Sequence, residues 1–563
     1  MTPWAARAAR LLPSLADWRP ARRAPGRDLL AGLTVAVVAL PLALAFGVGS
    51  GLGAQAGLAT AVVAGALAAV FGGSNLQVSG PTGAMTVVLV PIMRSHGPSG
   101  VLMVGLLAGV VLVVLALAGV GRYARYMPTP VIEGFTAGIA VVIALQQVPA
   151  ALGVSGASGE RVWQVAADAA VRFARDPRPV PLVMTLAVAA AMLAGARWRP
   201  TVPFSFVAVV VATAVAEVAR LDVARIGALP VGLPVPSAGF LDPGAVGTLV
   251  PAALAVAALG AVESLLCASV ADAMSVGERH DPDRELFGQG LANIAAPLFG
   301  GVPATAAIAR TAVNVRSGAR SRLAALTHAA VLAVIVFSAG GLVGRIPLAA
   351  LAGVLVATTV RMVEVGSLRA VARSTRGDAA VMALTFSVTV ALDLVTAVAV
   401  GVGVAIVLAL RAVARSVRVE QVPLEAGDHG DEERQLLAEH IVAYRFDGPL
   451  FFGAAHRFLL ELSEVADVRV VILRMSRVST IDATGAGVLG DVISRLEGRG
   501  IVVLLSGIRP GHDGVIGRLG VAGHLWRDGL VLPDTPAAIA RARTLIGRTP
   551  KGVVAPLGPV RFE

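Results

Sequence analysis

The stretch Asn75–Met85, which reads NLQVSGPTGAM, carries residue types that suit the binding of an anion, although it lies inside a long apolar region. A lipid-facing helix would not hold the run SGPTG, because irregular backbone at membrane depth is tolerated only where protein buries it or where it lines a cavity. Pro81 suits the first turn of a helix. The sequence therefore predicts an extended segment over Leu76–Ser79, followed by a half-helix that begins near Pro81. The free N–H groups and the positive dipole end of such a half-helix attract an anion.

A second motif of this kind occurs at Gly301–Thr305, which reads GVPAT. Both motifs place Gly and then Pro ahead of small residues or Thr. Gly and Pro are also common punctuation in membrane loops, but interrupted segments at matching places of two halves are typical of inverted-repeat transporters. We favour the repeat, in which two half-helices face each other.

Glu263 is an ionisable residue in the middle of another apolar segment, flanked by Gly260, Val262 and Leu265. Ionisable groups at such depth are costly and indicate a functional site. Because removal from water favours the neutral form of a carboxyl group, Glu263 is predicted to take up and release a proton. The structural alternative is a carboxylate permanently paired with Arg310.

The composition requires a membrane protein to position these residues. Of 563 residues, 56% are hydrophobic and 15% are charged, and the mean hydropathy is +0.78, which excludes an ordinary soluble chain. The net charge of +11 is explained by arginines in loops predicted to be cytosolic, so no nucleic-acid partner is expected. A single cysteine excludes an internal disulfide. No metal site, cofactor or cluster of catalytic residues is predicted, so the protein is not expected to be an enzyme.

The hydropathy pattern predicts a polytopic α-helical membrane protein with 14 transmembrane segments. Several segments, among them 287–300, 303–315 and 377–392, are shorter than the roughly 20 residues that cross a bilayer core, and the segment 76–93 is broken. Arginine counts place the N-terminus, and hence the C-terminus, in the cytosol, with the chain in the cell (inner) membrane. The predicted segments are 28–48, 53–72, 76–93, 99–120, 128–149, 179–195, 202–219, 247–271, 287–300, 303–315, 322–343, 347–362, 377–392 and 394–413.

A change in composition after Arg418 predicts a soluble α/β domain at the C-terminal end. Strands are expected at 441–446, 468–473 and 501–505, and helices at 454–462, 486–497 and 514–519. The predicted divisions are a cytosolic lead-in at 1–27, a transmembrane domain at 28–418, a linker at 419–436, the α/β domain at 437–546 and a tail at 547–563.

Nearly the whole chain resembles the SulP family of anion transporters, also called solute carrier family 26. The resemblance is carried by residues 28–51, by NLQVSGPTGAM at 75–85, by LGAVESLLCASVADAM at 259–274, by residues 283–321, and by VSTIDATGAGVL at 478–489 in a C-terminal STAS domain. It implies a seven-plus-seven inverted repeat with core and gate domains, a homodimer, and elevator-like movement of the core. The transmembrane domain is expected to be surrounded by membrane lipid.

In this family the anion lies between the two half-helices. The matching positions of this sequence are therefore candidate binding residues. The substrate-binding positions implied by the resemblance are Phe46, Ser79, Thr82, Gly83, Ala84, Thr305, Ala306 and Arg310. Helix capping is the alternative for the two threonines, ordinary packing for Phe46, and snorkelling to the cytosol for Arg310, which is expected two turns into its half-helix. Leu42 replaces a polar residue of many relatives, so a preference for sulfate is in doubt.

The resemblance also informs the coupling ion and the STAS domain. Sodium-coupled relatives have Asp and Thr where this chain has Glu263 and Cys267; a thiol is a poor ligand for sodium, which favours a coupling proton. Ala483 replaces the serine that is phosphorylated in related STAS domains, and Thr484 is expected to cap a helix.

The predicted function is secondary active transport of a small inorganic anion or carboxylate, such as sulfate or bicarbonate, by proton-coupled symport. Sodium-coupled bicarbonate symport and anion exchange are the alternatives among transporters. A STAS signalling scaffold that no longer transports is the alternative of another class. A cytosolic regulator is a possible partner of the STAS domain.

Overall fold

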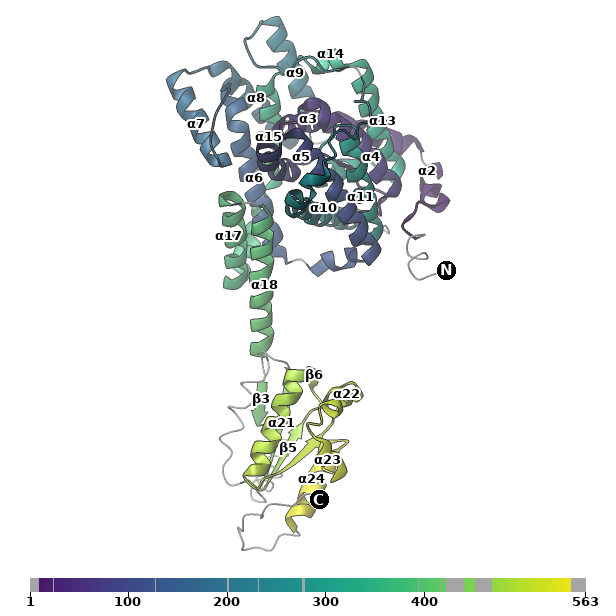
Figure 1. Cartoon of the computed structure of the whole chain (residues 1–563), viewed down its shortest axis with the longest axis vertical. Coiled ribbons are helices and arrows are strands. Elements are labelled where there is room, and N and C mark those ends of the chain that lie inside the picture. Colours follow the sequence, from purple (N-terminus) through teal and green to yellow (C-terminus); the bar gives the residue numbers. More distant parts are fainter. Residues whose placement is uncertain are drawn as a thin grey trace. The chain divides into compact units, whose positions relative to one another are not determined.

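A computed structural model gives the fold of the chain (Figure 1). The structure describes residues 10–23, 25–126, 128–199, 202–230, 232–275, 279–392, 394–416, 418–421, 440–450 and 468–547. The chain divides into two compact units, Met1–Gly403 and Val404–Glu563. The first is helical and holds every predicted site residue.

Seven helical stretches among the described residues are long and apolar enough to cross a membrane. They are α3 (Pro25–Gly49), α4 (Ala54–Phe71), α5 (Gly83–Ala118), α6 (Thr129–Leu152), α8 (Pro179–Trp198), η3 with α10 (Pro243–Ala245 and Val246–Met274), and α15 with α16 (Leu348–Met362 and Val365–Ser374). Shorter apolar helices include α9 (Phe204–Val218), α13 (Arg322–Ser338) and part of α18 (Leu394–Ser416). A polytopic helical membrane fold is therefore confirmed, while the number 14 stays a prediction.

Two of the predicted segments join in one long helix. Segments 76–93 and 99–120 both contribute to α5, which is broken at Gly97, where φ is 65°. The half-helix begins at Gly83 rather than near Pro81, because Thr82 is extended and acts as the N-cap. The structure therefore corrects the predicted start of this half-helix by two residues.

Two short strands precede the two half-helices and pair with each other. Strand β1 (Ser79–Gly80) leads into α5, and β2 (Thr305–Ala306) leads into α12 (Ile308–Arg316). The strands are antiparallel, with Ser79 opposite Ala306 and Gly80 opposite Thr305. The pairing brings the N-terminal ends of α5 and α12 together.

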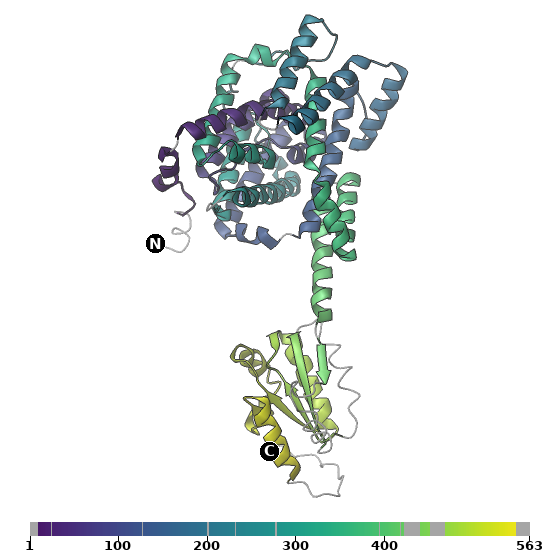
Figure 2. The ribbon, with the colours of Figure 1, turned by 180° about the vertical axis from the view of Figure 1, so that it is seen from behind.

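The remaining helices pack in two groups. Helix α11 (Pro282–Leu298) packs on α4 and α5, and α13 packs on α3 and α4. A second group forms where α15 packs on α6 and α8, and α17 (Arg376–Ala391) packs on α6. In both views the helices α3, α4, α10, α11 and α13 gather around one centre, whereas α7 (Val162–Arg175) lies at the periphery of this unit (Figures 1 and 2). The smaller elements are η1 (Leu15–Trp18), α2 (Arg19–Arg23), η2 (Gly121–Tyr126) and α14 (Gly340–Val343).

The N-terminal lead-in is attached to the helical unit by an ion pair. The guanidinium of Arg284, at the start of α11, donates to both carboxylate oxygens of Asp17 at 3.0 and 2.7 Å. This hydrogen bonding lowers the pKa of Asp17 to about 2. The carboxylate therefore stays charged at every physiological pH.

The second unit contains a sheet in the order β3-β4-β5-β7-β8, with β6 also paired to β4. All pairs are parallel except β3 with β4. One face of the sheet packs against α21 and the other against α24, which explains why Val470–Leu473 is a continuous apolar run. The elements are β3 (Arg418–Gln421), β4 (Ile441–Leu450), β5 (Val470–Arg474), β6 (Val478–Ile481), β7 (Val502–Ser506), β8 (Val531–Leu532), α21 (Ala483–Gly498), α22 (Pro510–Arg518), α23 (Gly523–Arg527) and α24 (Thr535–Gly547).

The predicted strands and two of the predicted helices of this unit are present, whereas β3, β6, β8, α23 and α24 were not predicted. The helix predicted at 454–462, residues 422–436 of the linker and residues 548–563 of the tail lie outside the described residues. Thr484 is not a cap: Asp482 is the N-cap of α21, and its side chain accepts from the Gly485 N–H at 2.7 Å.

Candidate functional site

Glu263 joins the start of α5 to strand β2 through two threonines. Its Oε2 accepts from Thr82 Oγ1 at 3.1 Å and from Thr305 Oγ1 at 2.7 Å, and the two hydroxyl oxygens are 3.0 Å apart. The three side chains come from α10, the start of α5 and β2, so the cluster forms only when the β1–β2 pair is in place. A change in the charge of Glu263 would therefore act on both half-helices at once.

The N-terminus of α5 presents unused backbone donors. Thr82 Oγ1 accepts from the Met85 N–H at 3.5 Å, which is a weak capping bond. The N–H groups of Gly83 and Ala84 have no hydrogen-bond partner among the described residues, as expected for the first turn of a helix. The helix dipole makes these two groups suitable donors for an anion, and anion binding by Gly83 and Ala84 stays a prediction. Thr82 both caps the helix and bonds Glu263, so the capping alternative does not exclude a role in the site.

The N-terminus of α12 is built differently from the expectation. Ala307 is its N-cap, and Thr305 lies in β2, so Thr305 does not cap the helix. The Ala306 N–H donates to Ser264 Oγ at 3.3 Å and is not a free donor. The available N–H groups belong instead to Ile308 and Ala309, which have no partner among the described residues and are exposed.

The Gly/Pro motifs that revealed the two half-helices are not equivalent in position. Pro81 follows β1 directly, whereas Pro303 precedes β2 by two residues. The pairing of Gly80 with Thr305 therefore sets the two motifs out of register. The two units that correspond are β1 with α5 and β2 with α12, although Gly and Pro occupy different positions in them.

Arg310 lies in the first turn of α12, not two turns into it. Its side chain is 1% exposed, and its Nη2 donates to the carbonyl oxygen of Pro81, at the other half-helix. Snorkelling to the cytosol is therefore wrong for Arg310. Among the described residues it forms no direct ion pair with Glu263, whose Oε2 bonds the threonines instead. Its buried positive charge strengthens the attraction of this region for an anion.

Cys267 lies one helical turn beyond Glu263 but bonds elsewhere. Its Sγ donates to Thr311 Oγ1 at 3.2 Å, and this hydroxyl accepts from the Val78 N–H at 3.0 Å. Cys267 thus supports the segment before β1. Among the described residues, no group of three or more His, Cys, Asp or Glu side chains could hold a metal ion.

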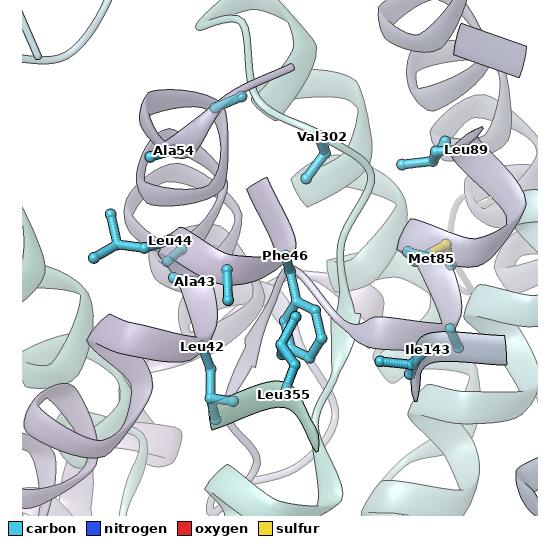
Figure 3. Packing of buried hydrophobic residues seen from close by; sticks show 14 of the residues in the cluster. Leu42, Ala43, Leu44, Phe46, Ala54, Met85, Leu89, Ile143, Val302 and Leu355 are labelled. Carbon is cyan, nitrogen blue, oxygen red and sulfur yellow. The ribbon is translucent and has the colours of Figure 1, made fainter. Parts of the chain in front are cut away.

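Phe46 forms an apolar wall beside the α5 N-terminus. It is 6% exposed and lies among Leu42, Ile143 and Leu355 (Figure 3). A Cβ atom placed on Gly83 would lie 3.1 Å from Phe46 Cε1 and would overlap Ile143 Cδ1. Phe46 therefore packs closely against Gly83 at the start of α5, and its contact with an anion stays a prediction.

Ser79 is directed away from the cluster around Glu263. Its Oγ accepts from Gln289 Nε2 at 2.6 Å. The oxygen of the Ser79 hydroxyl thus contacts α11, and contact between Ser79 and the anion stays a prediction.

Sequence reasoning missed a set of buried polar side chains around the site, four amides and one carboxyl group. Gln77 Nε2 donates to the Ser264 carbonyl at 3.1 Å, and Asn314 Nδ2 donates to the Leu76 carbonyl at 2.8 Å. On α11, Glu285, Gln289 and Asn293 are all at most 2% exposed. Their spacing of four residues, on one face of a helix, was a pattern that could have identified them.

Comparisons with known proteins agree with this architecture. Residues 26–385 match the sulfate permease family, and residues 437–526 match the STAS domain. The chain is 34% identical to the putative sulfate transporter YvdB of Bacillus subtilis, over 86% of this chain and 91% of that protein. It is 32% identical to the bicarbonate transporter BicA of Picosynechococcus, over 83% of this chain and 86% of that protein.

A solved structure supports the fold of the whole chain. Murine solute carrier 26 family member A9, an anion transporter solved in the inward-facing state, superposes with a TM-score of 0.84. The superposition covers 97% of this chain and 96% of that chain, at 20% sequence identity. The fold therefore persists although few residues are shared.

Proposed function

Because the chain belongs to the sulfate permease family of anion transporters, we propose that it moves a small anion such as sulfate or bicarbonate across the membrane together with a proton. The observation that carries the proposal is the bridge from Glu263 to Thr82 and Thr305, at 3.1 and 2.7 Å. It couples one titratable group to the two half-helices whose N–H groups hold the anion.

The anion is held by backbone donors, and one buried cation adds positive charge without pairing with it directly. The N–H groups of Gly83 and Ala84 face the anion from α5, those of Ile308 and Ala309 face it from α12, and Arg310 adds positive charge. Neutral donors bind a small anion without the deep trap of a direct ion pair. Binding of this kind permits release on the other side of the membrane.

Glu263 makes anion binding depend on protonation. A negative carboxylate beside the threonines repels the anion, and a proton removes the repulsion. By linkage, the anion then favours binding of the proton as much as the proton favours binding of the anion. The two ligands therefore bind and leave together, which is the requirement for symport.

Transport also requires movement of the helices and an assembled protein. The core helices around α10, α11 and α12 move relative to the group around α6, α8 and α15, in an elevator-like cycle. The STAS domain and the N-terminus face the cytosol, the protein forms a homodimer, and a cytosolic regulator acts through the STAS domain. The transmembrane domain is assigned to 28–418 and the STAS domain to 437–546.

Uptake by the purified protein in liposomes tests the proposal. Labelled sulfate and bicarbonate are offered with an inward proton gradient, with an inward sodium gradient, or with anion loaded inside the vesicles. An inward proton gradient should accelerate uptake, and replacement of sodium by choline should not change it. Sodium-driven uptake without any effect of protons would instead identify a sodium symporter. Uptake that requires internal anion would identify an exchanger.

A further inference from the structure

Helix α11 carries a row of three polar side chains that faces the two half-helix units. Glu285, Gln289 and Asn293 follow at intervals of four residues, and each is at most 2% exposed. Buried polar groups are costly unless their hydrogen bonds are made. Each of the three bonds β1 itself or a segment that leads into β1 or β2. The remaining bonds, from Gln289 to Glu285 and from Asn293 Nδ2 to the Gln289 carbonyl, lie within α11.

Glu285 and Gln289, the first two residues of the row, bond β1 and the loop before it. Glu285 Oε2 accepts from the N–H groups of Gly73 and Ser74 at 2.9 and 3.3 Å. Gln289 Nε2 donates to Glu285 Oε1 at 2.9 Å and to Ser79 Oγ at 2.6 Å. Gln289 thereby connects α11 to the first residue of β1.

Asn293 holds the approach to β2. Its Oδ1 accepts from the Ala304 N–H at 2.8 Å, and its Nδ2 donates to the Ala304 carbonyl at 2.9 Å. The side-chain amide thus pairs with both backbone groups of Ala304, as a neighbouring strand would. Ala304 is followed directly by Thr305, the first residue of β2.

We propose that Gln289 and Asn293 are positioning residues that determine which anion the site accepts. Strands β1 and β2 have two residues each, which is too short to fix their own spacing. Because these strands lead into α5 and α12, their offset sets the distance between the backbone donors of the two half-helices. That distance distinguishes a tetrahedral anion from a planar one, and the row on α11 fixes it. The inference rests on the proposed function.

The test compares two anions in the Gln289→Met variant, which keeps the side-chain length and removes the donor. KM and Vmax for sulfate and bicarbonate are measured in liposomes. We expect the ratio of Vmax/KM between the two anions to change at least tenfold, mainly through KM. The control is Gln147→Met in α6, because Gln147 is also buried but, among the residues that the structure describes, donates only to Ile143 of its own helix. Its ratio should stay within twofold of the wild type.

A double-mutant cycle separates positioning from direct contact with the substrate. Ser79→Ala removes the acceptor of Gln289, so it should reproduce the changed ratio, and the double variant should be no worse than either single variant. If Gln289→Met does not fold, Ser79→Ala carries the test. An unchanged ratio, effects that multiply in the double variant, or an equal change in Gln147→Met would each overturn the inference.

Uptake of the two anions by the wild-type protein shows which of the two proposals has failed. If it transports neither anion under any gradient, the proposed function fails and the inference fails with it. If it discriminates between the anions and the variants keep its ratio, only the positioning role is refuted.

Discussion

Neutralising Glu263 should uncouple anion binding from the proton. The carboxylate lies one hydrogen bond from Thr82, whose own turn supplies the Gly83 and Ala84 donors. A carboxylate and an anion separated by about 6 Å at an effective dielectric of about 20 repel by about 3 kcal/mol. In Glu263→Gln this repulsion is absent at every pH. The anion affinity of the wild type should therefore weaken by up to about 100-fold as Glu263 loses its proton, whereas that of the variant should stay constant.

The assay is uptake of labelled anion into liposomes with and without an inward proton gradient, together with the anion affinity of the purified protein over a range of pH. Glu133→Gln is the matched control, because Glu133 is a carboxylate of α6 that accepts from Ser367 at 2.5 Å, away from the half-helices. The control should keep the dependence on protons. Full proton-driven uptake in Glu263→Gln would refute the reasoning.

Three further predictions follow from contacts around the site and the N-terminal segment. Gly83→Ala should lower uptake in a folded protein, because the added methyl group would displace the end of the Ile143 side chain and would lie 3.1 Å from Phe46 Cε1; wild-type uptake, with normal elution on size exclusion, would contradict this. Thr305→Val should remove most proton-driven uptake, since it loses the 2.7 Å bond to Glu263, and Thr305→Ser should retain it, as measured in the same liposome assay. Asp17→Asn should destabilise the protein by about 1 kcal/mol after solvent screening. The lowered pKa of about 2 places this stabilisation above pH 4, with loss as the pH falls towards 2, so the difference in thermal unfolding between Asp17→Asn and wild type should be constant from pH 5 to 8 and should shrink near pH 3.

The breaks in the membrane helices were predictable because their cause is local. Gly, Pro and Thr in an apolar context exclude a continuous lipid-facing helix, wherever the chain goes afterwards. The starting residue was less certain, since the fixed φ of proline suits extended backbone as well as a first helical turn. In the structure the side chain of Thr82, not Pro81, marks the boundary.

The details of the site were not predictable because they depend on register. Ser79 was expected to face the anion, but the pairing of β1 with β2 and the amide of Gln289 direct its hydroxyl to α11. Ala306 likewise loses its N–H to Ser264, a residue far away in the sequence. A shift of one residue in the pairing register moves a side chain to the other face of a strand. Comparison of the two motifs within one sequence does not give the register of β1 and β2.

Proton coupling and the preference among anions, the two properties proposed for this transporter, depend on residues of different helices. Glu263 on α10 contributes a charge that a proton can cancel, whereas Gln289 and Asn293 on α11 contribute hydrogen bonds that hold the strands. Loss of the charge should change coupling and leave the ratio between anions intact, while loss of the amides should change the ratio and leave the dependence on protons. Because backbone N–H groups alone bind anions of many kinds, the anion preference of a relative could then change through α11 without any substitution at the residues that touch the anion.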